Sequence, residues 1–183
     1  QLVQLGYEVT PCRGKRPILG NWNRRPEIAQ DFNQYSNANV GIICGGRNNL
    51  VAVDVDVTNP FASNEVQTLA SEMLGMSPRR VGRAPKFLLN YRCSQKLRKI
   101  KSSIFEIDDE DCAIEILADG QQFVAFGIHP NTNESYLWPD DSLLDYELME
   151  LTAVASAQLT EFVAQAERVL ANYGPEKGRS TRA

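Results

Sequence analysis

The chain has 183 residues, a hydrophobic fraction of 43%, a charged fraction of 23% and a net charge of −4. This composition is typical of a soluble globular protein, and the length suffices for one domain or for two small lobes that share a core. No uninterrupted apolar run approaches the ~18 residues that a membrane-spanning helix needs. We therefore expect a soluble, cytoplasmic protein that does not enter a membrane. The sequence has no initial Met and no visible signal peptide, so we expect its natural start to lie upstream.

The four cysteines and the single histidine bear on metal and redox chemistry. Cys12, Cys44, Cys93 and Cys112 are far apart in the sequence and form no Cys-x-x-Cys motif. With His129 as the only histidine, this spacing argues against a zinc site. A chain of this length needs no disulfide framework, so we predict reduced thiols.

The first fifty residues predict two strands separated by a loop and a helix. Residues 6–11 form the first predicted strand, and residues 12–22 contain the Gly and Pro residues of a loop. A helix is predicted over 26–35, because a Pro suits its first turn and apolar residues recur at helical spacing. Residues 39–44 predict the second strand. Its connection to the next strand is short, so we expect these two strands to form a hairpin.

The stretch from residue 50 to residue 57 carries the most informative pattern. It is Val-rich, follows a turn-like Gly-Gly-Arg-Asn-Asn sequence, and predicts a buried strand. Side chains alternate along a strand, so Asp54 and Asp56 project to the same side. Two neighbouring carboxylates repel each other in apolar surroundings, and a divalent cation relieves that repulsion. The alternative is a strand that ends in solvent, where Asp begins a turn.

One helix and four strands are predicted between residues 58 and 126. The helix runs from about residue 63 to residue 74, with Ser63 as a candidate cap. Strands are predicted at 87–91, 100–107, 113–117 and 122–126. The Asp119-Gly120 turn between the last two strands is typical of a hairpin.

The last forty residues predict a helix and a polar tail. From about Ser142 to Tyr173, apolar residues recur at steps of three and four, and Gly174-Pro175 ends the pattern. Residues 174–183 are polar and basic, which is typical of a linker. We expect them to lead to another domain.

The segment from Ser77 to Lys101 contains nine basic residues and no acidic one, inside an acidic protein. A solvated hairpin face would explain it, but a phosphate-binding surface fits better beside a carboxylate pair. Six of these residues are predicted to contact DNA: Arg79, Arg80, Arg92, Arg98, Lys99 and Lys101.

The order of these motifs resembles the bifunctional DNA primase/polymerase (Prim-Pol) family of the archaeo-eukaryotic primase superfamily. The resemblance runs from about Tyr7 to Trp138. Its pieces are Gly-Lys-Arg-Pro at 14–17, Asn-Val-Gly-Ile at 39–42, the strand at 50–56, and the stretch at 115–130. Each piece is weak alone, and their order and spacing make the match specific.

The resemblance implies a metal-dependent catalytic centre. Asp54 and Asp56 match the two acids that the family carries on one strand, and Glu115 matches its third acid, beside a Gly-containing hairpin. These three residues are expected to hold two Mg²⁺ or Mn²⁺ ions for phosphoryl transfer.

The resemblance also implies three contacts to the incoming nucleotide. The family carries a small-x-His motif whose His contacts phosphates, and this sequence departs from it by placing Lys86 there. We expect Arg83 and Lys86 to pair with the triphosphate. His129 matches a small-x-His-Pro stretch after the third acid, where a nucleotide contact and a structural histidine are both open.

Taken together, we predict an α/β (α+β) protein with mixed sheets, two lobes, an RRM-like half and a C-terminal helix, its active site between the lobes. The catalytic domain would span 1–173 and the linker-like tail 174–183. The implied function is DNA primase/polymerase activity with a DNA template and primer and a dNTP or NTP, in a phage, plasmid or other mobile element. The implied partner is a downstream helicase domain.

Three rivals follow from the same residues. A two-metal nuclease also needs carboxylates beside basic side chains. A metal-dependent sugar-nucleotide transferase is disfavoured by the basic segment. A replication-initiation or DNA-binding module without catalysis is the non-enzymatic alternative, because the motif histidine is replaced.

Overall fold

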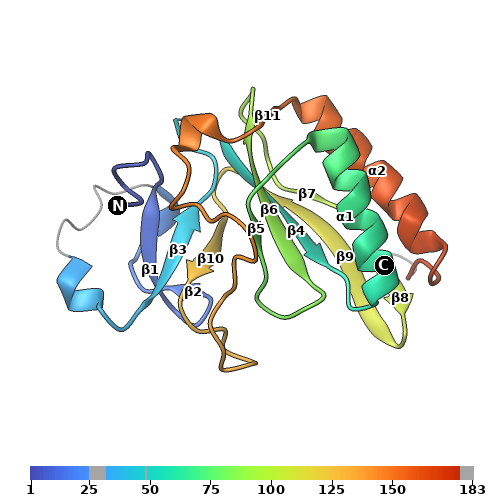
Figure 1. Ribbon diagram of the computed structural model, residues 1–183, viewed down its shortest axis with the longest axis horizontal. Coiled ribbons are helices and arrows are strands. Elements are labelled where there is room, and N and C mark those ends of the chain that lie inside the picture. The colour runs from blue at the N-terminus through green and yellow to red at the C-terminus, as the bar shows by residue number, and fades with distance from the viewer. Residues whose placement is uncertain (25–31, 48, 178–183) are drawn as a thin grey trace, which may run out of the picture.

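The protein folds into two sheets and two α-helices, described here from a computed structural model that covers residues 1–24, 32–47 and 49–177 (Figure 1). The four-stranded sheet has the order β10-β3-β1-β2. Its strands are β1 (Val9–Arg13), β2 (Arg16–Pro17), β3 (Asn39–Ile43) and β10 (Gln122–Phe126). The seven-stranded sheet has the order β11-β6-β4-β9-β7, with β5 on β6 and β8 on β9. Its strands are β4 (Leu50–Asp56), β5 (Arg79–Arg80), β6 (Phe87–Cys93), β7 (Ile100–Lys101), β8 (Phe105–Ile107), β9 (Glu110–Leu117) and β11 (Ala153–Val154).

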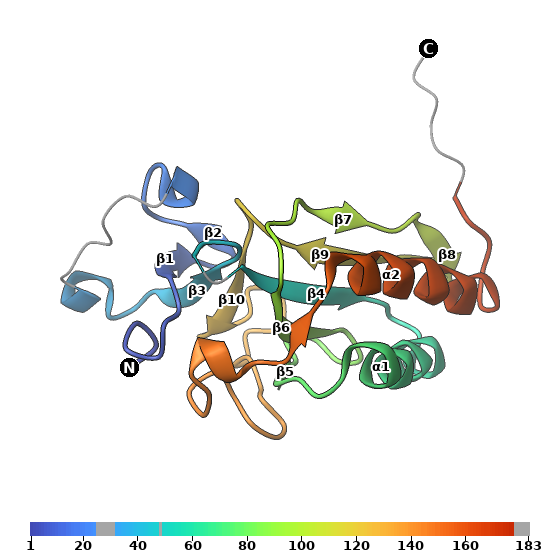
Figure 2. The same cartoon turned by 90° about the horizontal axis from the view of Figure 1, so that it is seen from above.

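The three layers are the four-stranded sheet, the seven-stranded sheet and the helices α1 (Pro60–Leu74) and α2 (Ser156–Ala171) (Figures 1 and 2). Alternation along β4 explains the order of the layers. Val51, Val53 and Val55 pack toward the helices, and Leu50 and Ala52 pack toward the other sheet. All strand pairs are antiparallel except β11 with β6, which makes the larger sheet mixed. The predicted α+β class and the C-terminal helix are confirmed.

The hairpin predicted between β9 and β10 is wrong, and the one predicted between β3 and β4 is limited to a single antiparallel bridge between Gly45 and Leu50, because each connection passes from one sheet to the other. β3 pairs with β1 and β10, whereas β4 pairs with β6 and β9. The two crossings meet at Gly45 and Asp119, where a Cβ on Gly45 would lie 2.6 Å from the Asp119 Cα. A tight turn thus fixes a reversal of the chain, but it does not decide which strand becomes the partner.

Helix α1 starts three residues earlier than predicted and has a different cap. The Asn59 Oδ1 accepts hydrogen bonds from the amides of Phe61 and Ala62, both at 3.0 Å, and Pro60 occupies the first helical position. The Ser63 hydroxyl instead donates to the Pro85 carbonyl at 2.8 Å.

The strand predicted over 100–107 is divided into β7 and β8. Between them, the Ser102 hydroxyl accepts a bond from the Ile114 amide and the Ser103 amide donates to Glu167 of α2. The Ser102 hydroxyl thus takes the place of one backbone acceptor of the ladder, although the Ser102 amide still donates to the Ile114 carbonyl at 2.9 Å.

The helix predicted from Ser142 begins only at Ser156. Residues 142–155 contain a turn closed by Asp145 on Ser142, the 3₁₀ turn η3 (Leu148–Glu150) and β11. The apolar residues at helical spacing in this stretch fill the core between the sheets without forming an α-helix. Neither helix in the described part of the chain is long and apolar enough to cross a membrane.

Two further predictions concern segments at the limits of the described residues. The helix predicted over 26–35 lies largely in residues 25–31, outside the described part, and its end forms the 3₁₀ turn η2 (Phe32–Tyr35). Within the tail, residues 174–177 lie along β8, where the Lys177 amide donates to the Ile104 carbonyl at 2.8 Å. Residues 178–183 lie outside the described part.

Candidate active site

The three predicted acids share one face of the seven-stranded sheet. Asp54 and Asp56 continue the row of Leu50 and Ala52, which faces the four-stranded sheet. Glu115 on β9 lies directly opposite Asp54 in the antiparallel register, so its side chain projects to the same face. We call Asp54, Asp56 and Glu115 the acidic row.

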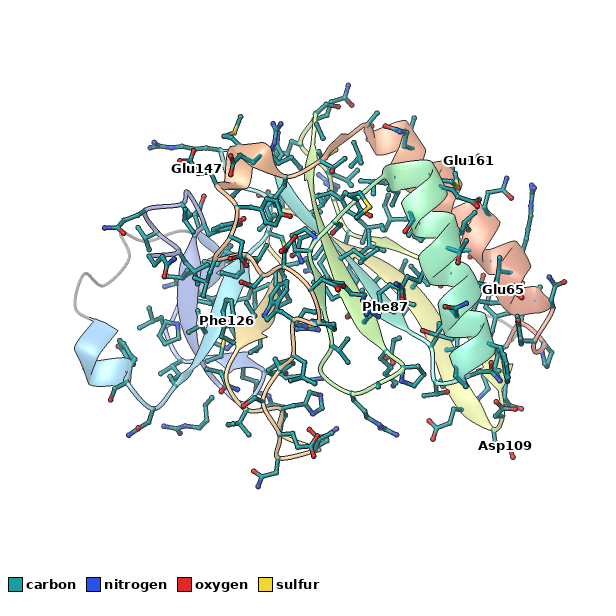
Figure 3. The ribbon with its side chains drawn as sticks, viewed as in Figure 1. Glu65, Phe87, Asp109, Phe126, Glu147 and Glu161 are labelled. Atoms are coloured by element: carbon teal, nitrogen blue, oxygen red, sulfur yellow. The ribbon has the colours of Figure 1, made fainter. Side chains whose placement is uncertain are left out.

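A cavity of about 190 Å³ opens between the two sheets beside this row. Figure 3, in which Phe87 marks β6 and Phe126 marks β10, shows the side chains that fill the space between the sheets. Asp54 and Asp56 line the cavity together with four cationic residues: Lys15, Arg80, Arg83 and Lys86. His129, Tyr136 and residues of β10 line it from the other side. The cavity therefore carries more positive than negative side chains, although the protein as a whole is acidic.

The environment of Asp54 disfavours its charged form. Burial raises the pKa of Asp54, and the neighbouring carboxylates of Asp56 and Glu115 raise it further. Arg80 and, more weakly, Lys15 oppose this shift. A bound cation would therefore stabilise the ionised carboxylate.

Arg80 lies inside the cavity, where burial lowers the pKa of its guanidinium. Its Nη1 donates to the Val124 carbonyl of β10, and its Cζ lies 4.8 Å from the centre of the Tyr136 ring. Among the described residues, neither the buried Nε of Arg80 nor the buried hydroxyl of Tyr136 has a hydrogen-bond partner. Arg80 on β5 thus links the seven-stranded sheet to β10 of the four-stranded sheet. Its position in a basic run of the sequence did not indicate this role.

Lysines neutralise the other two acids. Lys86 forms an ion pair with Asp56. The Nζ atoms of Lys99 and Lys101 lie 2.6 Å and 3.1 Å from the two carboxylate oxygens of Glu115. Partial burial alone would raise the pKa of Glu115, but hydrogen bonds from both lysines hold it below its usual value.

His129 is 4% exposed and is fixed by its own loop. The amides of Asn131 and Thr132 approach its Nδ1 at 3.3 Å and 3.4 Å, which assigns the proton of the neutral ring to Nε2. Burial lowers the pKa of His129, and nearby cations, Lys15 and Arg80 foremost, lower it further. The ring is therefore a neutral hydrogen-bond donor at the cavity.

Asn39 on β3 connects the two loops that carry Lys15 and His129. Its Nδ2 donates to the carbonyls of Gly14 and Ile128 at 3.0 Å and 2.8 Å, and its Oδ1 accepts from the Ile128 amide. This contact explains why two segments far apart in sequence line one cavity. The motifs at 14–17 and 39–42 contain Lys15 and Asn39, but the sequence identified neither as a site residue, and Tyr136 was missed.

The remaining basic residues do not form one surface. Arg79 points to the helix side and donates to Gln67 of α1 at 3.1 Å. The Nε of Arg92 donates to the Leu151 carbonyl at 3.3 Å. Arg98 is exposed and directly precedes Lys99, the first of the two lysines that contact Glu115. Of the six residues predicted to contact DNA, Arg98, Lys99 and Lys101 lie together near β7.

The acidic row offers the oxygen ligands that Mg²⁺ and Mn²⁺ prefer. Within the described residues, no three His, Cys, Asp or Glu side chains converge so as to hold a metal ion. Ion pairs with lysines give a physical reason why these acids do not converge, because they engage Asp56 and both carboxylate oxygens of Glu115. The donor set fits a divalent cation, because such an ion would offset the burial and the neighbouring carboxylates that raise the pKa of Asp54.

Comparison with known families decides the classification. The family model described as bifunctional DNA primase/polymerase, N-terminal, matches residues 1–156. The chain belongs to the Prim-Pol family. A search of curated proteins found no match. Membership confirms the resemblance seen in the sequence motifs, and it implies DNA primase/polymerase activity with DNA and nucleotides as substrates.

Proposed function

We propose that this Prim-Pol domain is a metal-dependent nucleotidyltransferase that joins a nucleotide from a dNTP or NTP to a primer 3′-hydroxyl on a DNA template. One observation carries the proposal. Asp54, Asp56 and Glu115 share one face of the sheet beside a cavity lined by four cationic side chains. Phosphoryl transfer needs such a combination of metal-binding carboxylates and phosphate-binding cations.

The acidic row would hold two Mg²⁺ or Mn²⁺ ions. When bound, such ions lower the pKa of the attacking hydroxyl and neutralise the leaving pyrophosphate. Asp54 and Asp56 line the cavity directly, and Glu115 joins them from the adjacent strand. The positive charge of the partly buried Arg80 favours the ionised form of Asp54.

The cationic side chains that line the cavity would bind the triphosphate. Arg83 and Lys86 supply positive charge at the cavity lining, and Lys15 adds to it from the loop after β1. The neutral His129 would donate an Nε2–H bond to a phosphate oxygen. This role matches the family's use of a histidine, although here the ring belongs to a loop that follows β10.

Template and primer phosphates would contact the exposed cations near β7. Arg98, Lys99 and Lys101 are exposed, whereas Arg79 and Arg92 donate hydrogen bonds within the protein. The family resemblance further supports a role in the replication of a phage, plasmid or other mobile element, with a helicase domain downstream. These contexts rest on the resemblance alone.

Incorporation of labelled nucleotides on a primed template, with Mn²⁺ present, tests the proposal. Asp54→Asn and Asp56→Asn should each reduce incorporation by at least about 100-fold, because several kcal/mol of transition-state stabilisation are lost. Glu72→Gln is the matched control. Glu72 is an exposed acid on α1, on the other side of the sheet from the cavity, and its loss should leave incorporation unchanged.

Two outcomes would overturn the proposal. Shortening of the labelled primer in place of extension would indicate a two-metal nuclease. Tight binding of primed DNA with no metal-dependent reaction on either strand would indicate a DNA-binding module without catalysis.

A further inference from the structure

Two lysines form ion pairs with Glu115, one of the three carboxylates of the acidic row. Lys101 lies directly opposite Glu115 in the pairing of β7 with β9, and Lys99 approaches from the loop before β7. Their Nζ atoms contact different oxygens of the carboxylate, at 3.1 Å for Lys101 and 2.6 Å for Lys99. Both oxygens that a cation would need are therefore engaged by ammonium groups.

These contacts are strong enough to order the side chains and weak enough to exchange. The side chains of Lys99 and Lys101 are 38% and 48% exposed, and that of Glu115 is 21% exposed. Solvent screens ion pairs of this exposure, so each contributes little net stability. A divalent cation on the carboxylate would repel both ammonium groups and replace them.

We propose that Lys99 and Lys101 are displaceable counter-ions of Glu115. Binding of a divalent cation at the acidic row takes over the Glu115 oxygens and releases both lysines to the phosphates of the primer–template backbone. The inference rests on the proposed function, because it assumes that the row binds metal. Beyond the proposed function, the inference states that Lys99 and Lys101 pair with Glu115 in the metal-free protein and bind DNA phosphates in the metal-bound protein.

The position of the lysines supports the second half of this exchange. β7 is the edge strand of the seven-stranded sheet, and the exposed Arg98 directly precedes Lys99. While Glu115 pairs with the lysines, both ammonium groups are engaged, and its one negative charge offsets one of the three positive charges of this group. Release would free both ammonium groups for phosphate, so DNA affinity is expected to depend on the metal.

Mn²⁺ affinity, measured by electron paramagnetic resonance of free Mn²⁺ without DNA or nucleotide, tests the first half. Lys99→Gln should tighten Mn²⁺ binding, and Lys99→Gln/Lys101→Gln should tighten it by about three- to tenfold, because no ammonium competes for the carboxylate. Arg98→Gln is the charge-matched control. It removes one positive charge from the same stretch, but within the described chain Arg98 makes no ion pair with Glu115.

DNA binding without nucleotide tests the second half. In metal-free buffer, Glu115→Gln should bind DNA more tightly than the unmodified protein, with a log–log salt slope steeper by about one to two, because both lysines are free. The same substitution in the Lys99→Gln/Lys101→Gln background should give no gain. Glu110→Gln, which removes an exposed acid of β9, controls for net charge alone.

The outcomes separate the inference from the proposed function. Equal effects of Lys99→Gln and Arg98→Gln on Mn²⁺ affinity would overturn the exchange and leave the metal site intact. Equal DNA-binding gains for Glu115→Gln and Glu110→Gln would also overturn it. Failure of the unmodified protein to bind Mn²⁺ would overturn both.

Discussion

Asp54 carries an energetic cost in the metal-free protein. Burial raises the pKa of its carboxyl group first of all, and Asp56 and Glu115 add to the shift. A folded-state pKa above the unfolded value means that the folded state binds the proton more tightly. The ionised carboxylate therefore destabilises the fold at neutral pH, as is common for groups placed for function.

Replacing Asp54 by Asn should raise the melting temperature of the metal-free protein. We expect a gain of about 2–4 °C at pH 7.5, for roughly 1 kcal/mol of relief in a chain of this size. The penalty is absent below the unfolded pKa of about 3.9 and grows as the pH rises through the folded pKa, so the gain should disappear near pH 3.5. Thermal scans at both pH values measure it. A lower melting temperature at pH 7.5 would show that the Arg80–Asp54 attraction outweighs the burial cost.

Lys86 is expected to act on the nucleotide more than on DNA. It lines the cavity and pairs with Asp56. Lys86→Ala should raise the apparent nucleotide KM by roughly 10- to 100-fold, because a charged hydrogen bond contributes about 1.5–3 kcal/mol, with DNA affinity unchanged. Steady-state kinetics measure this, and Lys86→His should recover part of the loss. Lys96→Ala is the control, since Lys96 is exposed and pairs with Asp119. Reduced DNA affinity with an unchanged KM would move Lys86 to the template surface.

The acids of the site could be predicted from the sequence, whereas most of the basic residues could not. Strand alternation places Asp54 and Asp56 on one face, and the structure shows this face. Arg79 and Arg80 are neighbours in a basic run, yet one contacts α1 and the other lies in the cavity. Long cationic side chains carry no periodic signal of their own, so only the fold shows which face each one occupies.

At the scale of the element, strands were predictable because their apolar residues alternate, but their partners were not. The Asp119-Gly120 turn indicated a hairpin, and β10 pairs with β3 instead of β9. Turn residues act locally, whereas the choice of sheet depends on which apolar faces can be buried together. For α1, the spacing of apolar residues predicted the helix but did not indicate that Asn59 caps it.

Asn59 should contribute measurably to stability. Its side chain accepts two amide bonds at the start of α1 and donates to Asp108 at 2.8 Å. Asn59→Ala should lower the free energy of unfolding by about 1 kcal/mol, as measured by urea denaturation, because helix amides lose their acceptor. Asn64→Ala, at an exposed position inside the same helix, should cost nothing, because Ala favours helix. Equal losses for the two variants would show that the cap does not stabilise α1.

At the scale of the whole molecule, two of the connections between the sheets contact each other. The chain crosses between the sheets after β3 and again after β9. Cys44 at the first crossing donates its amide to the Gln121 carbonyl at the second, at 2.9 Å. The acidic row belongs to one sheet and several lining residues to the other, so we expect the packing of these crossings to influence the width of the site.

Gly45 and Gly120 allow this packing to be measured. Their φ angles are nearly equal, +82° and +81°, so an Ala at either position meets the same backbone strain of roughly 1–2 kcal/mol. A Cβ at Gly45 would lie 2.5–3.0 Å from atoms of Asp119, whereas at Gly120 no described atom lies within 4 Å. Gly45→Ala should therefore lower the free energy of unfolding by about 1–3 kcal/mol more than Gly120→Ala, as measured by urea denaturation. Because the clash separates the two sheets, Gly45→Ala should also raise the nucleotide KM when measured under conditions where the variant remains folded. Equal losses of stability would mean that the two crossings can move apart freely, and that their contact does not set the width of the site.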